Sequence, residues 1–275
     1  MQTTEISTFS SVYGPVRSWR FGQSLGIDAI GPESSCPFNC VYCQLGEIQH
    51  QHGNRQIFVP TRKIQQDLQS FDFRSVNTIT LSGSGEPTMA QNLGEILTMA
   101  KQMTAKPIGV LTNGSLLSDR AVREELAIAD WVAVKVDAVF ADSLRRINRP
   151  IPTLSPQEMW AGLLQFRQTY SGHLAIQTML LSPWNNRDQT EYIQRMQALL
   201  PDEIQLNTPT RLRPLTHQLE ARGNHSPKTS YATRQLRRVQ AEVLQVFGDR
   251  IQRAIGIPVR YPLFNSLLNQ EGETG

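Results

Sequence analysis

The residues most suited to chemistry gather in one short stretch, CPFNCVYC, at residues 36–43. It contains Cys36, Cys40 and Cys43, which are the only three cysteines among 275 residues. Thiolates are soft ligands that suit iron–sulfur clusters and zinc. A four-iron cluster usually takes four thiolates, so three thiolates would leave one iron open to a small molecule. The C-x3-C-x2-C spacing therefore favours a cluster that can do chemistry as well as carry electrons.

Two other fates of these cysteines are open. A structural zinc site could add His50 or His52, which follow a few residues downstream. Structural zinc loops usually pair a C-x2-C unit with a second, distant pair, so the spacing here is atypical of zinc. Burial as an inert thiol is the common fate of a lone cysteine, but it does not explain three cysteines in one loop.

The composition fits an ordinary globular protein of one or two domains. Of the residues, 39% are hydrophobic and 19% are charged, and the formal charge is +3. This small basic excess permits an RNA or another phosphate-bearing partner without arguing for one. The N-terminal residues MQTTEISTFSSVYGPV lack the features of a signal peptide, and no stretch reaches the roughly 18 apolar residues of a membrane span. We therefore expect a cytoplasmic protein with no membrane partner.

Strand-like and helix-like segments alternate along the chain. Helical spacing appears at Ile64 and Leu68, for example, and Ser155, Pro156 and Glu158 form a capping box. Six apolar, β-branched runs predict short buried strands over residues 24–30, 76–82, 107–113, 131–138, 174–181 and 203–208. Such alternation builds a parallel sheet, either a doubly wound sheet or an open barrel, because six units are too few for a closed eight-stranded barrel. The expected fold class is α/β, a partial (β/α)6 TIM-like barrel of parallel strands with outer helices.

The last part of the chain is expected to be helical. A long helix is predicted from about Thr229 to Ile255, closed by Gly256 and Pro258. The chain then divides into a partial barrel with an N-terminal extension, residues 1–215, and a helical extension, residues 216–275, that packs on it. A solvated face is expected for the arginines of this helix, a nucleic-acid surface being the alternative; they are Arg234, Arg237, Arg238 and Arg250.

Polar and unusual residues follow every predicted strand. They are the cysteine loop, residues 83–87 and 112–114, and the pairs Lys135 with Asp137, Gln177 with Thr178, and Asn207 with Thr208. Loops are generally polar, which is the simplest explanation. Chemistry in parallel α/β proteins, however, belongs at the carboxyl ends of the strands, so six such groups predict one functional edge. Lys135 within an apolar strand needs a partner, and Asp137 on the same strand face can supply one, in a functional or a purely structural pair.

The cysteine spacing, with the aromatic Tyr42 just before the last cysteine, resembles the signature of radical S-adenosylmethionine (radical SAM) enzymes. The resemblance covers about residues 12–210. The stretches VYGPVRSWRFGQSLGIDAI and CVYCQLG resemble a subgroup of iron–sulfur oxidoreductases related to the tRNA wybutosine-synthesising radical enzymes.

This resemblance implies a set of cofactor contacts. Cys36, Cys40 and Cys43 would hold a [4Fe–4S] cluster whose open iron is chelated by SAM, with Tyr42 packed near the adenine. Residues 82–87 resemble the family's "GGE" motif beside the methionine amino group. The residues implied there and at later strand ends are Ser84 (in place of a glycine), Gly85, Glu86, Lys135, Asp137 and, more weakly, Asn113, Gln177, Thr178 and Asn207. The Glu86-Pro87 pair could instead simply open a helix.

The activity implied is reductive cleavage of SAM to a 5′-deoxyadenosyl radical that abstracts a hydrogen atom from a substrate. The electron would come from an external reductant such as a flavodoxin or a ferredoxin. With all three cysteines in one cluster, none remains for the extra cysteines of the wybutosine reaction. The resemblance and the basic excess favour a tRNA base over a peptide or small molecule, and Arg211 and Arg213 could bind an anionic substrate or face solvent. The alternative is a non-catalytic zinc- or cluster-binding module that binds RNA.

Overall fold

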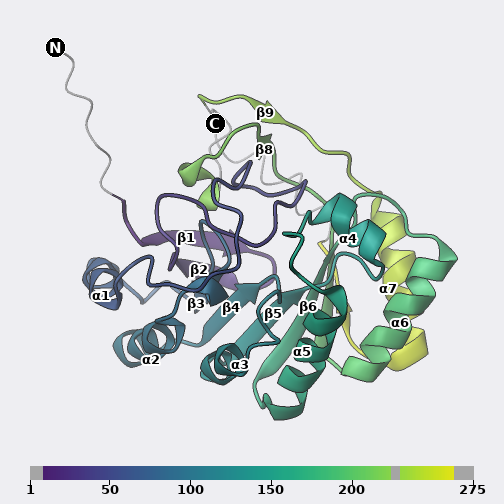
Figure 1. The fold of residues 1–275 in the computed structure, drawn as a ribbon, viewed down its shortest axis with the longest axis horizontal. Helices are drawn as coiled ribbons and strands as arrows, with labels where there is room; N and C mark the ends of the chain where they lie inside the picture. Colours follow the sequence, from purple (N-terminus) through teal and green to yellow (C-terminus); the bar gives the residue numbers. More distant parts are fainter. Residues whose placement is uncertain (1–8, 224–229, 263–275) are drawn as a thin grey trace.

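A curled sheet forms the centre of the computed structural model, which describes residues 9–223 and 230–262 (Figure 1). The strand order is β1-β2-β3-β4-β5-β6-β7-β10. The six predicted runs become the neighbouring parallel strands β2 (Gly22–Ile27), β3 (Thr78–Leu81), β4 (Ile108–Thr112), β5 (Trp131–Lys135), β6 (His173–Met179) and β7 (Glu203–Asn207). The predicted partial barrel of parallel strands is therefore confirmed.

Two edge strands were not predicted. Strand β1 (Val12–Ser18) pairs antiparallel with β2, and strand β10 (Val259–Arg260) pairs parallel with β7. Strand β1 is largely exposed and contains Gly14 and Pro15, so it lacks an apolar run. Strand β10 has two residues, which is too short to give a periodic signal.

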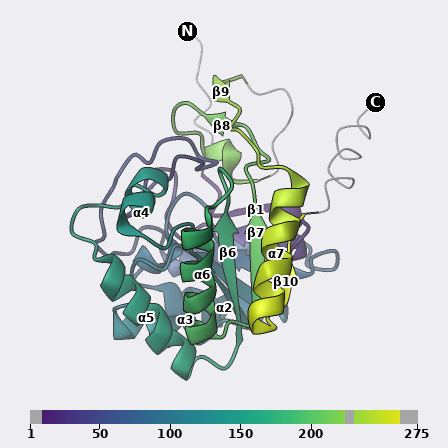
Figure 2. The same cartoon turned by 90° about the vertical axis from the view of Figure 1, so that its right-hand side faces the viewer.

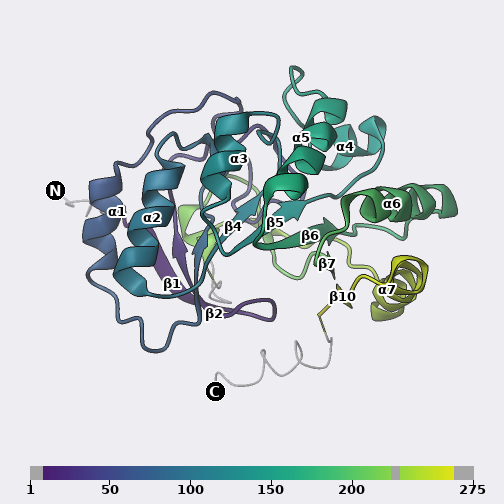
Figure 3. The same cartoon turned by 90° about the horizontal axis from the view of Figure 1, so that it is seen from below.

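The helices cover the outer side of the curled sheet, which Figure 3 shows as an arc around the strands. They are α1 (Thr61–Leu68), α2 (Leu93–Thr104), α3 (Arg120–Leu126), α5 (Pro156–Thr169), α6 (Asn186–Leu199) and α7 (Ala241–Ile255), and a short helix α4 (Ala141–Ile147) follows β5. Ile64 and Leu68 of α1 are buried, and the Ser155 side chain accepts a hydrogen bond from Glu158 N at the start of α5, as predicted. The outer strand face is apolar and packs on these helices, for example through Val134, Ile176 and Ile204.

The predicted final helix is wrong in its first half, because α7 begins at Ala241. Residues 230–240 contain no helix, and Thr229 lies outside the described residues. Strand β9 (Thr233–Arg234) instead pairs with β8 (Arg213–Pro214), and Val239 N donates to Thr208 Oγ1 at 3.0 Å. Arg234, Arg237 and Arg238 are therefore not on a helix. Tertiary hydrogen bonds to the loop after β7 prevail here over a local preference for helix.

Helix α7 lies beside α6 and β10 (Figure 2). Arg250 of α7 donates to Asn186 Oδ1 and Gln189 Oε1 of α6, at 3.1 and 2.7 Å. Strand β10 then adds residues after 215 to the main sheet. The domain boundary at residue 215 stays a prediction. Among the described residues, no helix has the length and apolarity needed to cross a bilayer.

Candidate cofactor site

The cysteine loop follows β2 and is held by backbone hydrogen bonds to distant segments. Cys36 N donates to His50 O at 3.1 Å, and Val41 N donates to Ile147 O, at the end of α4, at 2.9 Å. Asn39 N donates to Asn148 O at 3.0 Å. The three thiols are half-buried and free of disulfides. Helix α4 and the segment around His50 thus fix the positions of the three cysteines in space.

Amide groups donate directly to two of the sulfurs. Asn113 Nδ2 lies 3.3 Å from Cys36 Sγ, and Asn148 Nδ2 lies 3.3 Å from Cys40 Sγ. Burial, and next the charge of Asp137, raises the pKa of Cys40 to about 12, and burial raises the pKa of Cys36 well above its ordinary value. Thiolates in this place are unfavourable unless a metal bonds to them. Soft donors with N–H groups aimed at sulfur are therefore suited to an iron–sulfur cluster.

The two histidines of the zinc alternative have other partners. His50 Nε2 lies 2.9 Å from Glu33 Oε2, and the ring of His52 stacks on Phe58 with a centroid separation of 6.3 Å. Among the described residues, no hydrogen bond or ring contact joins the side chain of either histidine to the three cysteines.

Gly85 and Glu86 pack directly on the residue that precedes the first cysteine. Glu86 N donates to Ser35 O at 3.1 Å, and a Cβ at position 85 would lie 1.8 Å from the same oxygen. Only glycine allows this approach, and the approach places the loop after β3 against the cysteine loop.

The side chain of Glu86 is buried and accepts four hydrogen bonds. Two come from the backbone and hydroxyl of Thr88, one from Thr112 Oγ1 at 2.6 Å and one from Asn113 N at 2.7 Å. Burial raises the pKa of Glu86 although these donors oppose the shift. Glu86 thus caps the short 3₁₀ helix η1 (Pro87–Met89), as the helix-opening interpretation expects. Its contact with SAM stays a prediction.

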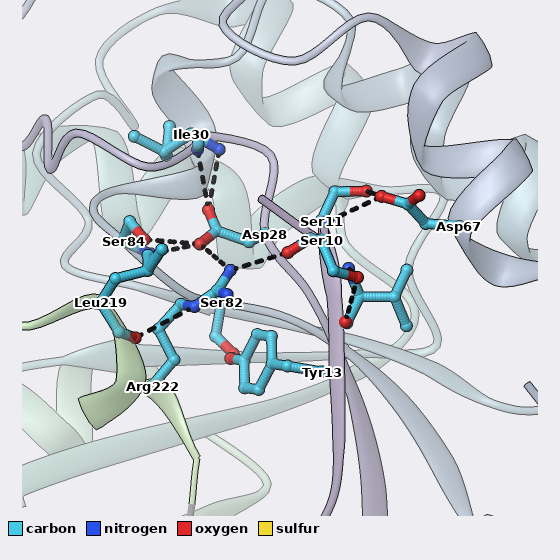
Figure 4. Close-up of polar contacts among 12 residues, drawn as sticks. Ser10, Ser11, Tyr13, Asp28, Ile30, Asp67, Ser82, Ser84, Leu219 and Arg222 are labelled. Atoms are coloured by element: carbon cyan, nitrogen blue, oxygen red, sulfur yellow. Dashed lines mark hydrogen bonds and ion pairs between the residues drawn. The ribbon is translucent and has the colours of Figure 1, made fainter. Parts of the chain in front are cut away.

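The side chain of Ser84 points to Asp28, which Figure 4 shows at the centre of a polar group. Asp28 Oδ2 accepts from Ser84 N and Oγ at 3.0 and 2.6 Å, and Asp28 Oδ1 accepts from the backbone of Ile30 and Gly31 at 3.0 and 3.1 Å. Arg222 Nη1 completes the set at 2.8 Å, with side-chain exposures of 0% for Asp28 and 10% for Arg222. Asp28 therefore ties the start of the cysteine loop to the loop after β3.

Arg222 comes from the 3₁₀ helix η2 (Leu219–Arg222), far along the chain from Asp28. Its guanidinium lies over the rings of Phe9 and Tyr13, 5.2 and 5.0 Å from their centroids. Tyr13 in turn shares a hydrogen bond with Ser82, and burial raises the pKa of Tyr13 to about 12 (Figure 4). The segment after β7 is thus fastened to β1 and to the end of β2.

A second network joins Tyr42 to the end of β5. The Tyr42 hydroxyl donates to Asp137 Oδ2, which also accepts from Asn148 Nδ2 at 2.8 Å. Lys135 Nζ lies 3.5 Å from Asp137 Oδ1 and 4.7 Å from the centroid of the Tyr42 ring. The expected Lys135–Asp137 pair is therefore present. A pocket beside this network is lined by Asn113, Lys135, Asp137, Phe140, Asn148 and Trp160, among others.

The remaining candidates do not join this network. Gln177 Nε2 donates to Gln205 Oε1 at 2.9 Å, and Asn207 Oδ1 accepts from Thr208 N. Thr178 faces the helical layer, where its hydroxyl contacts Val136 O and Tyr192 Oη, each at 2.8 Å. Arg211 donates to Gln44 Oε1 of the cysteine loop at 2.8 Å.

Three site residues were not predicted from the sequence, namely Arg222, Asn148 and Asp28. Asn148 is placed by α4 and carries no pattern of its own. Asp28 did carry a signal, because a carboxylate at the end of the apolar run LGIDAI is as unusual as Lys135 in its strand.

The profile of the Radical SAM superfamily matches residues 34–196. The chain belongs to the radical SAM superfamily. A curated relative, UPF0026 protein slr1464 of Synechocystis sp., is 51% identical over 257 residues, which make up 92% of this chain and 97% of that protein.

Two solved structures share the fold of this chain. Streptococcus suis SuiB bound to its precursor peptide SuiA superposes with a TM-score of 0.62 at 12% identity, covering 84% of this chain and 47% of SuiB. The anSMEcpe structure with bound AdoMet gives a TM-score of 0.56 at 15% identity, covering 91% and 66%. These identities establish a common curled, mostly parallel half-barrel.

Radical SAM enzymes use a [4Fe–4S] cluster with three cysteine ligands together with SAM, and they depend on an external reductant. The family therefore confirms the predicted cofactors. The assignment of SAM contacts to single residues stays a prediction.

Proposed function

We propose that this chain cleaves SAM reductively at a [4Fe–4S] cluster held by Cys36, Cys40 and Cys43. The bound cofactors would supply a 5′-deoxyadenosyl radical that abstracts a hydrogen atom from the substrate. The observation that carries this proposal is the loop of three half-buried sulfurs with Asn113 and Asn148 amides donating to two of them. Those donors stabilise negative charge on sulfur and orient the ligands.

The protein's own residues would bind and orient SAM. Lys135 offers a cation beside the sulfurs for the SAM carboxylate, and Asp137 with Asn148 holds that cation and Tyr42 in place. Gly85 brings backbone groups of the loop after β3 close to the cysteine loop. Ser84, Glu86, Asn113, Gln177 and Asn207 complete the proposed cofactor-binding set.

Two finer assignments belong to this proposal. The electron donor would be a flavodoxin or a ferredoxin. The substrate would be a tRNA base, in keeping with the resemblance to the wybutosine-related subgroup, although the three cysteines leave none for the extra cysteines of that reaction.

The test is anaerobic reconstitution with iron and sulfide, followed by dithionite and SAM, with 5′-deoxyadenosine and bound iron as the measured quantities. We expect 5′-deoxyadenosine from the wild type, and loss of both the product and about one full cluster of iron in Cys40→Ala. His50→Ala is the matched control, because it removes a candidate zinc ligand from the same loop and should keep iron and activity. A colourless protein that holds zinc, loses it in His50→Ala and forms no 5′-deoxyadenosine would instead establish the non-catalytic module.

A further inference from the structure

The inner face of the sheet is polar, in contrast to the apolar outer face that packs on the helices. Strand pairing places Lys135, Gln177, Gln205 and Arg260 opposite one another in a single row across β5, β6, β7 and β10. Residues paired in this way share one face of a sheet. The row therefore leads from the proposed cofactor site at Lys135 to the open edge of the barrel at Arg260.

Aromatic rings cover this inner face at the amino-terminal ends of the strands. Phe21, in the turn between β1 and β2, stacks on Trp131 with a centroid separation of 4.0 Å. A Cβ at Gly109, the neighbour of Trp131 on β4, would lie 1.8 Å from that indole. Gly109 thus leaves room for the indole ring of Trp131 on this face.

The open edge of the barrel is bridged by the same turn. Arg260 Nη2 of the edge strand β10 donates to Trp19 O at 3.1 Å, which links the two ends of the curled sheet. Arg260 also lies 3.4 Å from Glu203 Oε2. The neighbour of Trp19 in this turn is Arg20, so a second guanidinium is brought to the same edge.

Like charges lie close together at this edge. Burial, and then the charges of Arg211 and Arg260, lowers the pKa of Arg20 to about 10, with Glu203 as the opposing carboxylate. Glu203 is already shared, because it accepts from Gln205 and lies 3.7 Å from His173 Nε2 as well as near Arg260. Arg20 thus lies near two like charges and near one carboxylate that is already engaged. Such an arrangement is stabilised by an added anion.

Two buried polar atoms of this face lack a partner among the described residues. They are Arg20 Nε and Thr80 Oγ1, and the Thr80 residue is 4% exposed. Thr80 pairs with Gly109 and therefore shares the face of Trp131. Buried donors are nearly always satisfied, so unpaired ones on a face with surplus charge indicate groups that meet a ligand.

We propose that the inner face binds the substrate through a phosphate group at Arg20, Arg211 and Arg260, which we call the arginine edge. This assignment names the substrate class of the radical SAM site and rests on the function proposed above. A phosphate carries more than one negative charge, which suits three guanidinium groups better than a single carboxylate does. The amides of Gln177 and Gln205, between the arginine edge and Lys135, would contact the polar body of the substrate.

Ribose 5-phosphate is a suitable probe, because ribose supplies the same body without the charge. Titration of the reconstituted protein without dithionite, followed by calorimetry and tryptophan fluorescence, should show binding of ribose 5-phosphate and about tenfold weaker binding of ribose or none. Arg20→Gln should weaken binding about tenfold, since it removes a charge-assisted hydrogen bond. Gluconate, a carboxylate with a similar body, should bind more weakly than the phosphate ester.

Arg17→Gln is the matched control. Arg17 belongs to the same hairpin and is exposed. It pairs with Gln23, next to the inner-face pair Val16 and Ser24, so it lies on the opposite face of the sheet. Its variant should bind like the wild type. Arg211→Gln, in the loop after β7, gives a second test if Arg20→Gln unfolds. Equal effects of Arg17→Gln and Arg20→Gln, or equal binding of ribose and ribose 5-phosphate, would overturn the proposal.

Competition by total tRNA separates two sources of the same phosphate chemistry. Displacement of ribose 5-phosphate by tRNA would assign the phosphate to a nucleic acid, and no displacement would assign it to a small phosphorylated molecule. Because binding is measured without SAM cleavage, a protein that binds the probe but forms no 5′-deoxyadenosine would overturn only the proposed function. A protein that forms 5′-deoxyadenosine but ignores the probe would overturn only the arginine edge.

Discussion

The cysteine loop and the loops after β3 and β5, which we together call the cysteine rim, differ from the arginine edge in how they use buried charge. At the rim, three buried carboxylates are saturated with donors. Asp28 accepts from the backbone of Ile30 and Gly31 and from the side chains of Ser84 and Arg222. Glu86 accepts four hydrogen bonds, and Asp137 accepts from Tyr42, Asn148 and Met179 N and lies beside Lys135. At the arginine edge, Arg20 lies near two like charges and one engaged carboxylate, and its Nε has no partner among the described residues. Thr80 Oγ1, on the inner face of β3, also lacks a partner among these residues.

This difference separates residues that position segments of the chain from residues that receive a ligand. A saturated buried carboxylate fixes the segments that donate to it, because the loss of any donor weakens the stabilisation of a buried charge. Asp28, Glu86 and Asp137 therefore hold the cysteine loop against the loops after β3 and β5. Unpaired atoms such as Arg20 Nε and Thr80 Oγ1 hold nothing in the free protein and gain most from a ligand. The comparison predicts large stability losses at the rim and small ones at the arginine edge.

The largest effect is expected for Asp28→Asn. The change keeps the size of the side chain but leaves the Arg222 guanidinium buried without a countercharge, and breaking a buried pair in this way costs about 3–5 kcal/mol. Urea unfolding monitored by circular dichroism measures the loss. Asp142→Asn removes one partner of an exposed pair with Arg145 and should change the unfolding free energy by less than about 0.5 kcal/mol. Similar values for the two variants would show that Asp28 does not fasten the segment after β7.

Two buried strand threonines give a matched test of the same comparison. Thr112 Oγ1 donates to Glu86 and accepts from Gly114 N at 3.0 Å, whereas Thr80 Oγ1 has no partner among the described residues. Thr112→Val should therefore lower the unfolding free energy by about 1–3 kcal/mol, and Thr80→Val should leave it unchanged within about 0.5 kcal/mol or raise it. Denaturant midpoints of both variants, measured side by side, decide the point. A large loss in Thr80→Val would mean that the inner face of the sheet is as saturated as the rim.

Much of this architecture could be predicted from the sequence, because it depends on local patterns. Six apolar runs gave six parallel strands, and the Ser155 capping box opened α5 as predicted. The Lys135–Asp137 pair follows from the two-residue period of a strand and the cost of burying an unpaired ammonium.

Long-range pairing set the limit of these predictions. Arg222 meets Asp28 across 194 positions, and no pattern around either residue points to the other. Strand β10 has two residues and exists because β7 offers a free edge. The predicted helix from Thr229 failed over residues 230–240 for the same reason, since Thr208 and β8 capture that segment. The arginine edge likewise assembles from a turn, a loop and an edge strand, so it appears only once the barrel curls.

The smallest effect concerns a saturated carboxylate at the periphery, Asp67 of α1. Asp67 Oδ2 accepts from Ser11 N and Oγ at 2.8 and 2.7 Å, next to the start of β1. Burial alone would raise the pKa of Asp67, but the hydrogen bonds from Lys63 and Ser11 outweigh burial and lower it. A pKa lowered by folding means that the stabilisation is present above the unfolded pKa of about 4 and is lost as the pH falls through the folded pKa.

Asp67→Asn should therefore destabilise the protein by about 1 kcal/mol at pH 7 and by less at pH 3, because pH 3 lies below the unfolded pKa and part of the stabilisation is then lost. Urea midpoints of both proteins at the two pH values measure the change. Asp249→Asn, an exposed carboxylate on α7, is the control and should give no pH-dependent difference. If the gap between Asp67→Asn and the wild type were equal at both pH values, the ionised carboxylate would not be what holds the start of β1. Saturation with donors would then matter only inside the rim, where water cannot replace them.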